Sequence, residues 1–208
     1  MAHRLRRHAE RHRARRGDGN LLREEIMRAT EKLLLKTNDV DAISIRAIAN
    51  AVRVTPPSIY MHFESKEQLI LAVCEREFEL FDARLAEATE GVTDPVEALK
   101  AMGRAYVMFG LEHQEQYRFL FMSSEPEWTM RDPETKDLSG FGRLVELVER
   151  CVETGAFARG DAFAISCGLW TAVHGVTSLL IAHPHFPWPP VDELVAQGID
   201  VHCRGLRT

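Results

Sequence analysis

The stretch that most constrains the fold is residues 55–70, TPPSIYMHFESKEQLI. Thr55 precedes Pro56, and proline is favoured at the first position of a helix, where its missing N–H breaks no hydrogen bond. Residues 65–68, SKEQ, have the form of a capping box, in which the glutamine reaches back to the serine amide. The stretch therefore predicts two helices, one ending near residues 63–64 and a second beginning directly after.

Apolar residues recur at helical spacing along the rest of the chain, and no segment alternates as a strand does. We predict an all-α fold, in which three short N-terminal helices are joined by a long fourth helix to a C-terminal helical bundle. The predicted segments are an arm at 1–17, a three-helix domain at 18–64 and the bundle at 65–208. Helices are expected at 20–37 with Asn20 as N-cap, 45–52 after Ser44, 56–64, 66 to beyond 81, 95–112, 113–122, 134–154, 162–182 and from 191 to before 205, with a loop at 123–133 and a rigid linker at 183–190.

The second and third predicted helices are joined by a tight turn at residues 51–54, which is the spacing of a helix-turn-helix unit. In such a unit the second helix enters the major groove of DNA, and its first residues face base edges and phosphates. The hydrogen-bonding and cationic side chains at these positions are candidate DNA contacts: Ser44, Arg46, Thr55, Ser58, Tyr60, His62 and Lys66.

Local roles compete with DNA contact at several of these positions. Ser44, Thr55 and Ser65 are helix caps whether or not DNA is bound. Tyr60 and His62 can also pack locally. The small core of the domain is expected to contain Phe63 with Ile48, Ala49, Val54 and Ile59.

Charge is distributed unevenly along the chain. Residues 1–16 carry seven arginines and one glutamate, a net charge of +6, whereas the remaining residues carry 19 basic and 30 acidic side chains, a net charge of -11. A cationic arm on an acidic body indicates a polyanionic partner, although a solvated tail has the same composition. The candidate arm contacts to DNA are Arg4, Arg6, Arg7, Arg11 and Arg13. Deleting residues 1–16 is expected to weaken DNA binding and flatten its salt dependence.

Residues 44–70, SIRAIANAVRVTPPSIYMHFESKEQLI, resemble the DNA-binding segment of the TetR family of bacterial repressors. The resemblance covers residues 20 to about 81. It rests on the Ile-Ala pair of the second helix, the Val-Thr entry to the third, the Tyr-x-His-Phe ending and the Ser-Lys-Glu-x-Leu start of the fourth. It implies a homodimeric regulator of double-stranded operator DNA, and it adds Pro57 to the DNA-facing positions above.

One position departs from the family pattern. Arg53 stands where the family usually has glycine, at a turn position that favours positive φ. A non-glycine residue adopts this conformation at a cost of about 1 kcal/mol. Either the turn is reshaped or Arg53 accepts the strain, and Arg53 also becomes a candidate for contact with the DNA backbone.

The segment GLWTAVHGVTSLLI resembles a Trp-x-x-x-His-Gly signature of one subgroup of TetR-like C-terminal domains, matched by Trp170, His174 and Gly175. The resemblance implies a four-helix dimer interface built from residues 161–182 and 191–203 of each subunit. The candidate interface residues are Phe163, Leu169, Val173, Val176, Leu180 and Leu194.

The family bundle also implies a pocket for a small apolar or amphipathic effector, with ordinary core packing as the alternative for each residue. The candidate lining residues are Met102, Tyr106, Phe109, Phe119, Met122, Trp128, Trp170 and His174. For His174, a hydrogen-bonded interior position competes with a role in ligand binding or pH sensing. We expect a repressor released by its ligand, and the sequence does not distinguish this from an activator or from a repressor that needs a corepressor.

The sequence offers few signals for other classes of function. The sequence has no GxSxG, HExxH or phosphate-cradling glycine loop, so no enzyme and no cofactor is predicted. His183 and His185 lack the partners of a metal site. Cys74, Cys151, Cys167 and Cys203 are widely spaced without a CxxC and are expected as reduced thiols of a cytoplasmic protein. No secretory signal and no apolar run near the length of a membrane span are recognised. The remaining alternative is a helical interaction adaptor that has lost DNA reading.

Overall fold

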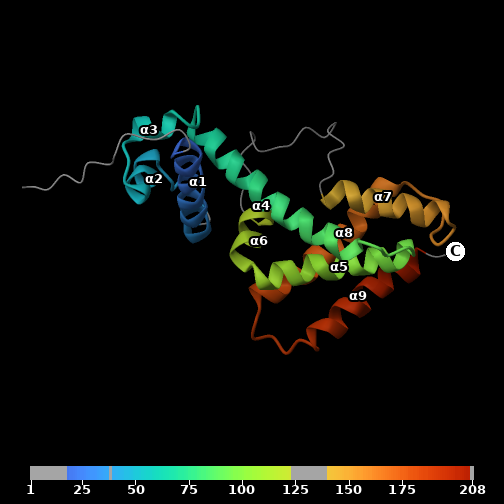
Figure 1. The fold of residues 1–208 in the computed structure, drawn as a ribbon. Helices are drawn as coiled ribbons and strands as arrows, with labels where there is room; N and C mark the ends of the chain where they lie inside the picture. The colour runs from blue at the N-terminus through green and yellow to red at the C-terminus, as the bar shows by residue number, and fades with distance from the viewer. Residues whose placement is uncertain (1–17, 38, 123–139, 207–208) are drawn as a thin grey trace, which may run out of the picture.

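The computed structural model describes residues 18–37, 39–122 and 140–206, and every regular element among them is an α-helix. Figure 1 shows two parts, which we call the head and the body. The head contains α1 (Asp18–Thr37), α2 (Ile45–Val52) and α3 (Pro56–Tyr60). The body contains α5 (Pro95–Glu112), α6 (Gln114–Phe121), α7 (Gly140–Glu153), α8 (Ala162–Ala182) and α9 (Val191–Gly205). The helix α4 (Lys66–Thr89) runs from one part into the other.

Local signals in the sequence set the limits of the head helices. The Ser44 hydroxyl accepts a hydrogen bond from the Ala47 N–H at 3.2 Å and caps α2. Pro56 begins α3, as predicted. Ile48 and Ile59 are fully buried, and Phe63 is 5% exposed with the Arg23 guanidinium lying over its ring. The small core of the head is therefore filled by the residues that the pattern indicated.

Some predicted boundaries differ from the structure. The first helix begins at Asp18, so Asn20 lies inside it. The third helix ends at Tyr60 rather than near residues 63–64. Only half of the predicted capping box forms, because the Ser65 hydroxyl accepts from the Gln68 N–H while the Gln68 side chain donates to Glu64. The predicted loop with Trp128 lies outside the described residues.

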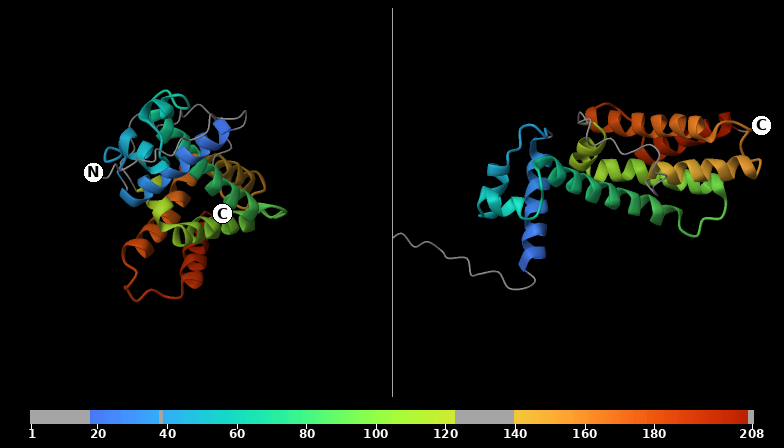
Figure 2. Two further views of the ribbon diagram at one scale, coloured as in Figure 1. Left: turned by 60° about the vertical axis from the view of Figure 1, so that its left-hand side comes forward. Right: turned by 90° about the horizontal axis from the view of Figure 1, so that it is seen from above.

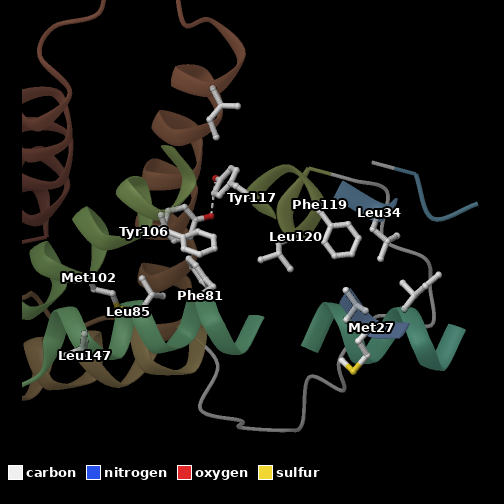
Figure 3. Packing of buried hydrophobic residues seen from close by; sticks show 14 of the residues in the cluster. Met27, Leu34, Phe81, Leu85, Met102, Tyr106, Tyr117, Phe119, Leu120 and Leu147 are labelled. Atoms are coloured by element: carbon white, nitrogen blue, oxygen red, sulfur yellow. Dashed lines mark hydrogen bonds between the residues drawn. The ribbon is translucent and has the colours of Figure 1, made fainter. Parts of the chain in front are cut away.

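The helix α4 joins the two hydrophobic cores into one. Its buried face runs from Leu69, Ile70 and Val73 on the head side to Phe81 and Leu85 on the body side. Figure 3 shows Phe119 of α6 beside Leu34 of α1 and Phe81 beside Tyr106, with Leu120 between these two groups. The views of Figure 2 show the head set to one side of the body, with α4 and α6 nearest to it. Contacts on α4 and α6 therefore connect the body to the head.

The helix α5 lies at the centre of the body and contacts α4, α6, α7, α8 and α9. Its approach to α8 requires a residue without a side chain, because a Cβ built on Gly110 would lie 2.3 Å from Cγ2 of Thr177. Ion pairs fasten α5 to α9 at the surface, from Lys100 to Asp200 at 2.9 Å and from Arg104 to Asp192. The body is thus a layered bundle built around one closely packed helix.

The helix α8 is apolar and largely uncovered. Within the described part of the chain it is the one helix long and apolar enough to cross a membrane by length and composition, with a mean hydropathy of 1.5. The sequence analysis recognised no apolar run of this length, because Ser166, Thr171 and His174 interrupt it. The mean hydropathy of the helix stays high in spite of these three residues. Most of α8 is not buried, so this helix presents an apolar face that the other described residues of the subunit leave uncovered.

Candidate nucleic-acid interface and effector cavity

The face of α3 presents most of the side chains predicted to contact DNA. Thr55, Pro57 and Tyr60 are exposed, and Tyr60 retains 52% of its surface. Ser58 is half-buried, and its hydroxyl lies 3.0 Å from that of Thr55, so Thr55 pairs with a side chain rather than capping the backbone. A short helix with polar and aromatic side chains directed outward matches the requirement for reading base edges.

Further predicted contacts surround α3 at the starts of two other helices. Arg46 is exposed in the first turn of α2, beside the Ser44 cap. Lys66 is half-buried at the first position of α4, where backbone N–H groups favour an anion such as a phosphate. His62 is half-buried directly after α3. The candidate arm residues Arg4, Arg6, Arg7, Arg11 and Arg13 lie outside the described residues.

Sequence reasoning overlooked Met61, which follows α3 and is 83% exposed. This largely solvated methionine directly follows exposed Tyr60 in the chain. The sequence offered no signal for it, because Met61 lies just past the end of α3, where helical periodicity no longer applies.

The structure resolves the question of the turn at Arg53. Its φ is 58° and ψ is 41°, so Arg53 adopts the left-handed conformation and is the one non-glycine residue with positive φ in the described ranges. The Arg53 N–H bonds to the Ala49 and Asn50 carbonyls and closes α2. The turn keeps its shape, and Arg53 accepts a strain of about 1 kcal/mol.

A cavity of about 980 Å³ lies in the body, with walls from every helix between α4 and α9. Three predicted pocket residues line it: Met102, Tyr106 and Trp170. Four of the residues predicted for the dimer interface line it as well: Phe163, Leu169, Val173 and Val176. The apolar pattern of α8 therefore did not separate the side chains that line the cavity from those available for a dimer interface.

Other predicted pocket residues lie elsewhere. Phe109 and Phe119 are each 5% exposed and belong to the core, where Phe109 packs edge-on against Phe81. Met122 is 43% exposed at the end of α6. Trp128 lies outside the described residues. Phe109, Phe119 and Met122 do not line the cavity, because aromatic and methionine composition marks an interior without showing which residues face a void.

Leu180 and Leu194, both predicted at the dimer interface, pack within the subunit. Leu180 is 6% exposed in a small cluster with Val107 and Val195, and Leu194 packs against that cluster. Leu180 therefore faces α5 and α9 of its own chain. The side chains that α8 leaves outward include Phe163 and Leu179, which are 60% and 48% exposed.

His174 does not line the cavity but ends a hydrogen-bonded chain behind its wall. The Trp170 indole N–H donates to the Tyr106 hydroxyl at 3.2 Å, which lies 3.3 Å from the Tyr117 hydroxyl, and Tyr117 lies 2.7 Å from Nδ1 of His174. Figure 3 shows the tyrosine pair. With each group donating to the next, Nδ1 is an acceptor, which requires neutral imidazole. Burial lowers the pKa of His174 and raises the pKa values of Tyr106 and Tyr117, so the chain stays uncharged.

A second buried polar group lies where the head meets the body. Glu77 of α4 is 2% exposed, and its Oε1 atom has no hydrogen-bond partner. Its neighbour Arg76 pairs instead with Glu24 and Glu31 of α1. Burial, with a smaller contribution from the charge of Glu31, raises the pKa of Glu77 to about 7. This carboxyl lies between Val73 and Phe81 on the buried face of α4.

None of the four cysteines is in a disulfide within the described residues, and burial raises the pKa of Cys151 to about 11, so that thiol is unreactive at neutral pH. His183 and His185 are exposed. In the ranges that the structure describes, no three His, Cys, Asp or Glu side chains gather in a way that would hold a metal ion.

Comparison with known proteins identifies the class. A family model described as bacterial regulatory proteins of the tetR family matches residues 26–73, and one described as a tetracyclin repressor-like C-terminal domain matches residues 99–202. Together with the head geometry, these matches define a helix-turn-helix, DNA-binding transcription regulator. The chain belongs to the TetR family.

Individual relatives agree with this class. The chain is 27% identical over 143 residues to the uncharacterized HTH-type transcriptional regulator YobS of Bacillus subtilis, covering 68% of this chain and 70% of that protein. It is 35% identical over 81 residues to the HTH-type transcriptional activator FasR of Mycolicibacterium smegmatis, over 38% of this chain and 36% of FasR.

Solved structures share the fold. A protein of unknown function from Rhodococcus sp. RHA1 has a TM-score of 0.74 and 24% identity, covering 96% of this chain and all of its own. A TetR family regulator from Marinobacter aquaeolei VT8 also has a TM-score of 0.74, at 18% identity, covering 92% of this chain and 98% of its own. At these identities the likeness establishes the arrangement of helices.

Proposed function

We propose that the protein is a homodimeric, ligand-responsive repressor of the bacterial cytoplasm, released from operator DNA when a small apolar or amphipathic molecule occupies the body cavity. The observation that supports this most directly is the continuity of α4. Phe78, Phe81, Asp82 and Leu85 of this helix line the cavity, while Leu69 and Val73 pack in the core shared with the head. A ligand that changes the position of α4 changes the position of α3.

The head contacts of this proposal are the side chains grouped around α3: Ser44, Arg46, Thr55, Pro57, Ser58, Tyr60, His62 and Lys66. Exposed Met61 joins them as an apolar contact, suited to a thymine methyl group. The division into an arm at 1–17, a DNA-binding domain at 18–64 and a sensor and dimerisation domain at 65–208 belongs to the same proposal.

A second copy of the chain is the proposed cover for α8. A single helix-turn-helix reads one half-site, and a two-fold dimer reads two at fixed spacing. Leu179→Asp would place a charge on the apolar face and is expected to shift the dimer to monomer in analytical ultracentrifugation. Leu80→Asp is the matched control, because Leu80 is a leucine of similar exposure, 55%, on α4. Equal dimerisation of both variants would place the interface elsewhere.

The two-state mechanism follows from differential binding. A ligand lowers operator affinity only if it binds the released arrangement more tightly than the DNA-bound arrangement. The test is to find compounds that raise the unfolding temperature and to measure operator binding with each. Trp170→Ala removes part of the cavity wall, and Trp188→Ala, in the α8–α9 loop, is the control.

Compounds that act through the cavity should lose both effects in Trp170→Ala and keep them in Trp188→Ala. A bound compound that leaves operator affinity unchanged would contradict ligand control. A compound that strengthens operator binding would indicate a corepressor or an activator, and the relative FasR is described as an activator.

A further inference from the structure

The charge of the cavity wall restricts the ligand. Among the described residues that line the cavity, the acidic side chains are Asp82, Glu146 and Glu149, and neither lysine nor arginine is among them. The basic side chain of this wall is His202, whose Nδ1 lies 2.8 Å from the Gly198 carbonyl oxygen. A carboxylate, sulfonate or phosphate inside would meet three carboxylates, with no lysine or arginine of the described wall to pair with, and an anion buried without such a partner is disfavoured.

The side-chain donors of Trp170, Tyr106 and Tyr117 are already engaged in one hydrogen-bonded network. The Trp170 N–H donates to Tyr106 at 3.2 Å, and the Tyr106 hydroxyl lies 3.3 Å from the Tyr117 hydroxyl. Both hydroxyls lie near the single acceptor Nδ1 of His174. The inner wall therefore offers a polar network that is satisfied by itself, and an anionic head group would have to break it.

Aromatic rings make up much of the remaining wall. They come from α4, α5, α6, α7 and α8 and include Phe81, Tyr106, Phe121, Phe141, Phe163 and Trp170. Phe141 lies edge-on to both Phe163 and Trp170, with ring centroids 5.5 Å and 5.9 Å apart, so the faces of these rings are not stacked on each other. Ring faces carry partial negative charge and attract a cation, most strongly where water is excluded.

The carboxylates are distributed over two helices of the same wall. Asp82 of α4 accepts a hydrogen bond from the Gly140 N–H at 2.7 Å, which fixes its position at the start of α7. Glu146 and Glu149 follow on α7, both exposed, at the solvent side of the cavity. A cation that entered past the two glutamates would reach the aromatic interior next to Asp82.

We infer that the cavity binds a lipophilic organic cation, monovalent and partly aromatic, rather than an anionic acyl compound. The inference rests on the proposed function, because it assigns the chemical class of the proposed effector. The cavity of about 980 Å³ admits a cation with several rings, which is within the size range of ligand pockets in proteins.

The test uses tetraphenylphosphonium and tetraphenylborate, ions of the same shape and opposite charge. Calorimetric titration of the full-length protein should give a dissociation constant at least roughly tenfold lower for the phosphonium ion, since a favourable cation–π and carboxylate environment is worth one to two kcal/mol. Equal affinity, tighter binding of the borate or binding of neither ion would overturn the inference.

Matched variants locate the preference. Glu146→Gln with Glu149→Gln removes two exposed charges of the cavity wall, and it should reduce the ratio of the two affinities about threefold. Glu79→Gln removes an exposed charge of α4 that does not line the cavity and should leave the ratio unchanged. An equal response of both variants would assign the preference to the net charge of the protein and contradict a local site.

Operator binding is measured on the same samples, so the two failures are distinguishable. If the cation binds and the operator complex is undisturbed, the inferred class of ligand is supported and the proposed role as inducer is contradicted. Operator binding that is released by the anion and not by the cation contradicts the ligand class and keeps the regulator.

Discussion

The head and the body hold their polar side chains in opposite ways. In the head, Ser44, Thr55 and Tyr60 are exposed and are positioned by short-range features, namely a cap, a turn and a helix five residues long. In the body, Tyr106, Tyr117 and His174 point inward and bond to each other across α5, α6 and α8. The exposed polar side chains of the head are therefore positioned by neighbours in sequence, and the buried polar side chains of the body by packing between helices that are distant in sequence.

This difference shows which side-chain positions can be predicted from the sequence. A hydroxyl at a cap has the same orientation in any protein with that cap, so the head could be assigned residue by residue. The cavity depends on which side chain of α8 happens to meet which residue of α5, and composition alone placed Phe109 and Phe119 at the cavity, although they lie in the core.

The largest expected effect comes from the close packing of the body. Gly110→Ala would bring a Cβ to 2.3 Å from Thr177 and 3.0 Å from the Tyr117 ring, and such overpacking costs about 3 kcal/mol or more. Urea unfolding should show a correspondingly lower midpoint. Gly19→Ala in α1, where nothing lies within 4 Å, is the control. Similar midpoints for the two variants would show that α5 and α8 are not in close contact.

The next effect separates binding from folding in the head. Tyr60→Ala removes a side chain that is 52% exposed, so operator affinity should fall roughly 30-fold while the free energy of unfolding changes by less than about 0.5 kcal/mol. Fluorescence anisotropy with labelled operator measures the first quantity and urea unfolding the second. Tyr60→Phe tests whether the hydroxyl or the ring carries the contact. A matching loss of stability would assign Tyr60 to the core instead.

The third prediction concerns Glu77, where the head and body cores meet. Its pKa is raised from 4.5 to about 7, so the folded state holds an extra proton between these values and stability falls as pH rises through them. Glu77→Gln should raise the free energy of unfolding by about 2 kcal/mol at pH 8 and by less than half of that at pH 5.

The control for Glu77 is Glu75→Gln, an exposed carboxylate on the same helix. It should change stability little at either pH. A Glu77→Gln gain that does not depend on pH would mean that burial of the charge is not the source of the instability.

The smallest effect is expected at Arg53. Arg53→Gly relieves the left-handed strain but adds freedom to the unfolded chain, so stability should rise by about 0.5 kcal/mol. Arg53→Ala removes the charge and keeps the strain. If Arg53 also contacts the DNA backbone, both variants lower the salt dependence of operator binding equally. A loss of stability in Arg53→Gly would contradict strain at this turn.

How much of the structure could be predicted from the sequence also differs between locally determined features and features that depend on packing between helices. The all-α fold, the Ser44 cap, the Pro56 start and the helix limits at Asp161 and Ala182 were all predicted, because caps and periodicity are local. The position of His174 behind the cavity wall was open, since a histidine on an apolar helix face has the same sequence pattern whether it binds a ligand or a tyrosine. Glu77 gave no signal, because in sequence it is one acidic residue among several on α4.

The measurement that tests the central claim most directly is binding of the purified protein to DNA from its own upstream region, against competitor DNA, at two salt concentrations. The account predicts a specific dimer–DNA complex whose affinity falls steeply with salt, as several phosphate contacts require, and which Tyr60→Ala weakens roughly 30-fold. A complex of equal affinity with competitor DNA, or none at either salt concentration, would contradict the reading of the head as a sequence-specific DNA-binding surface.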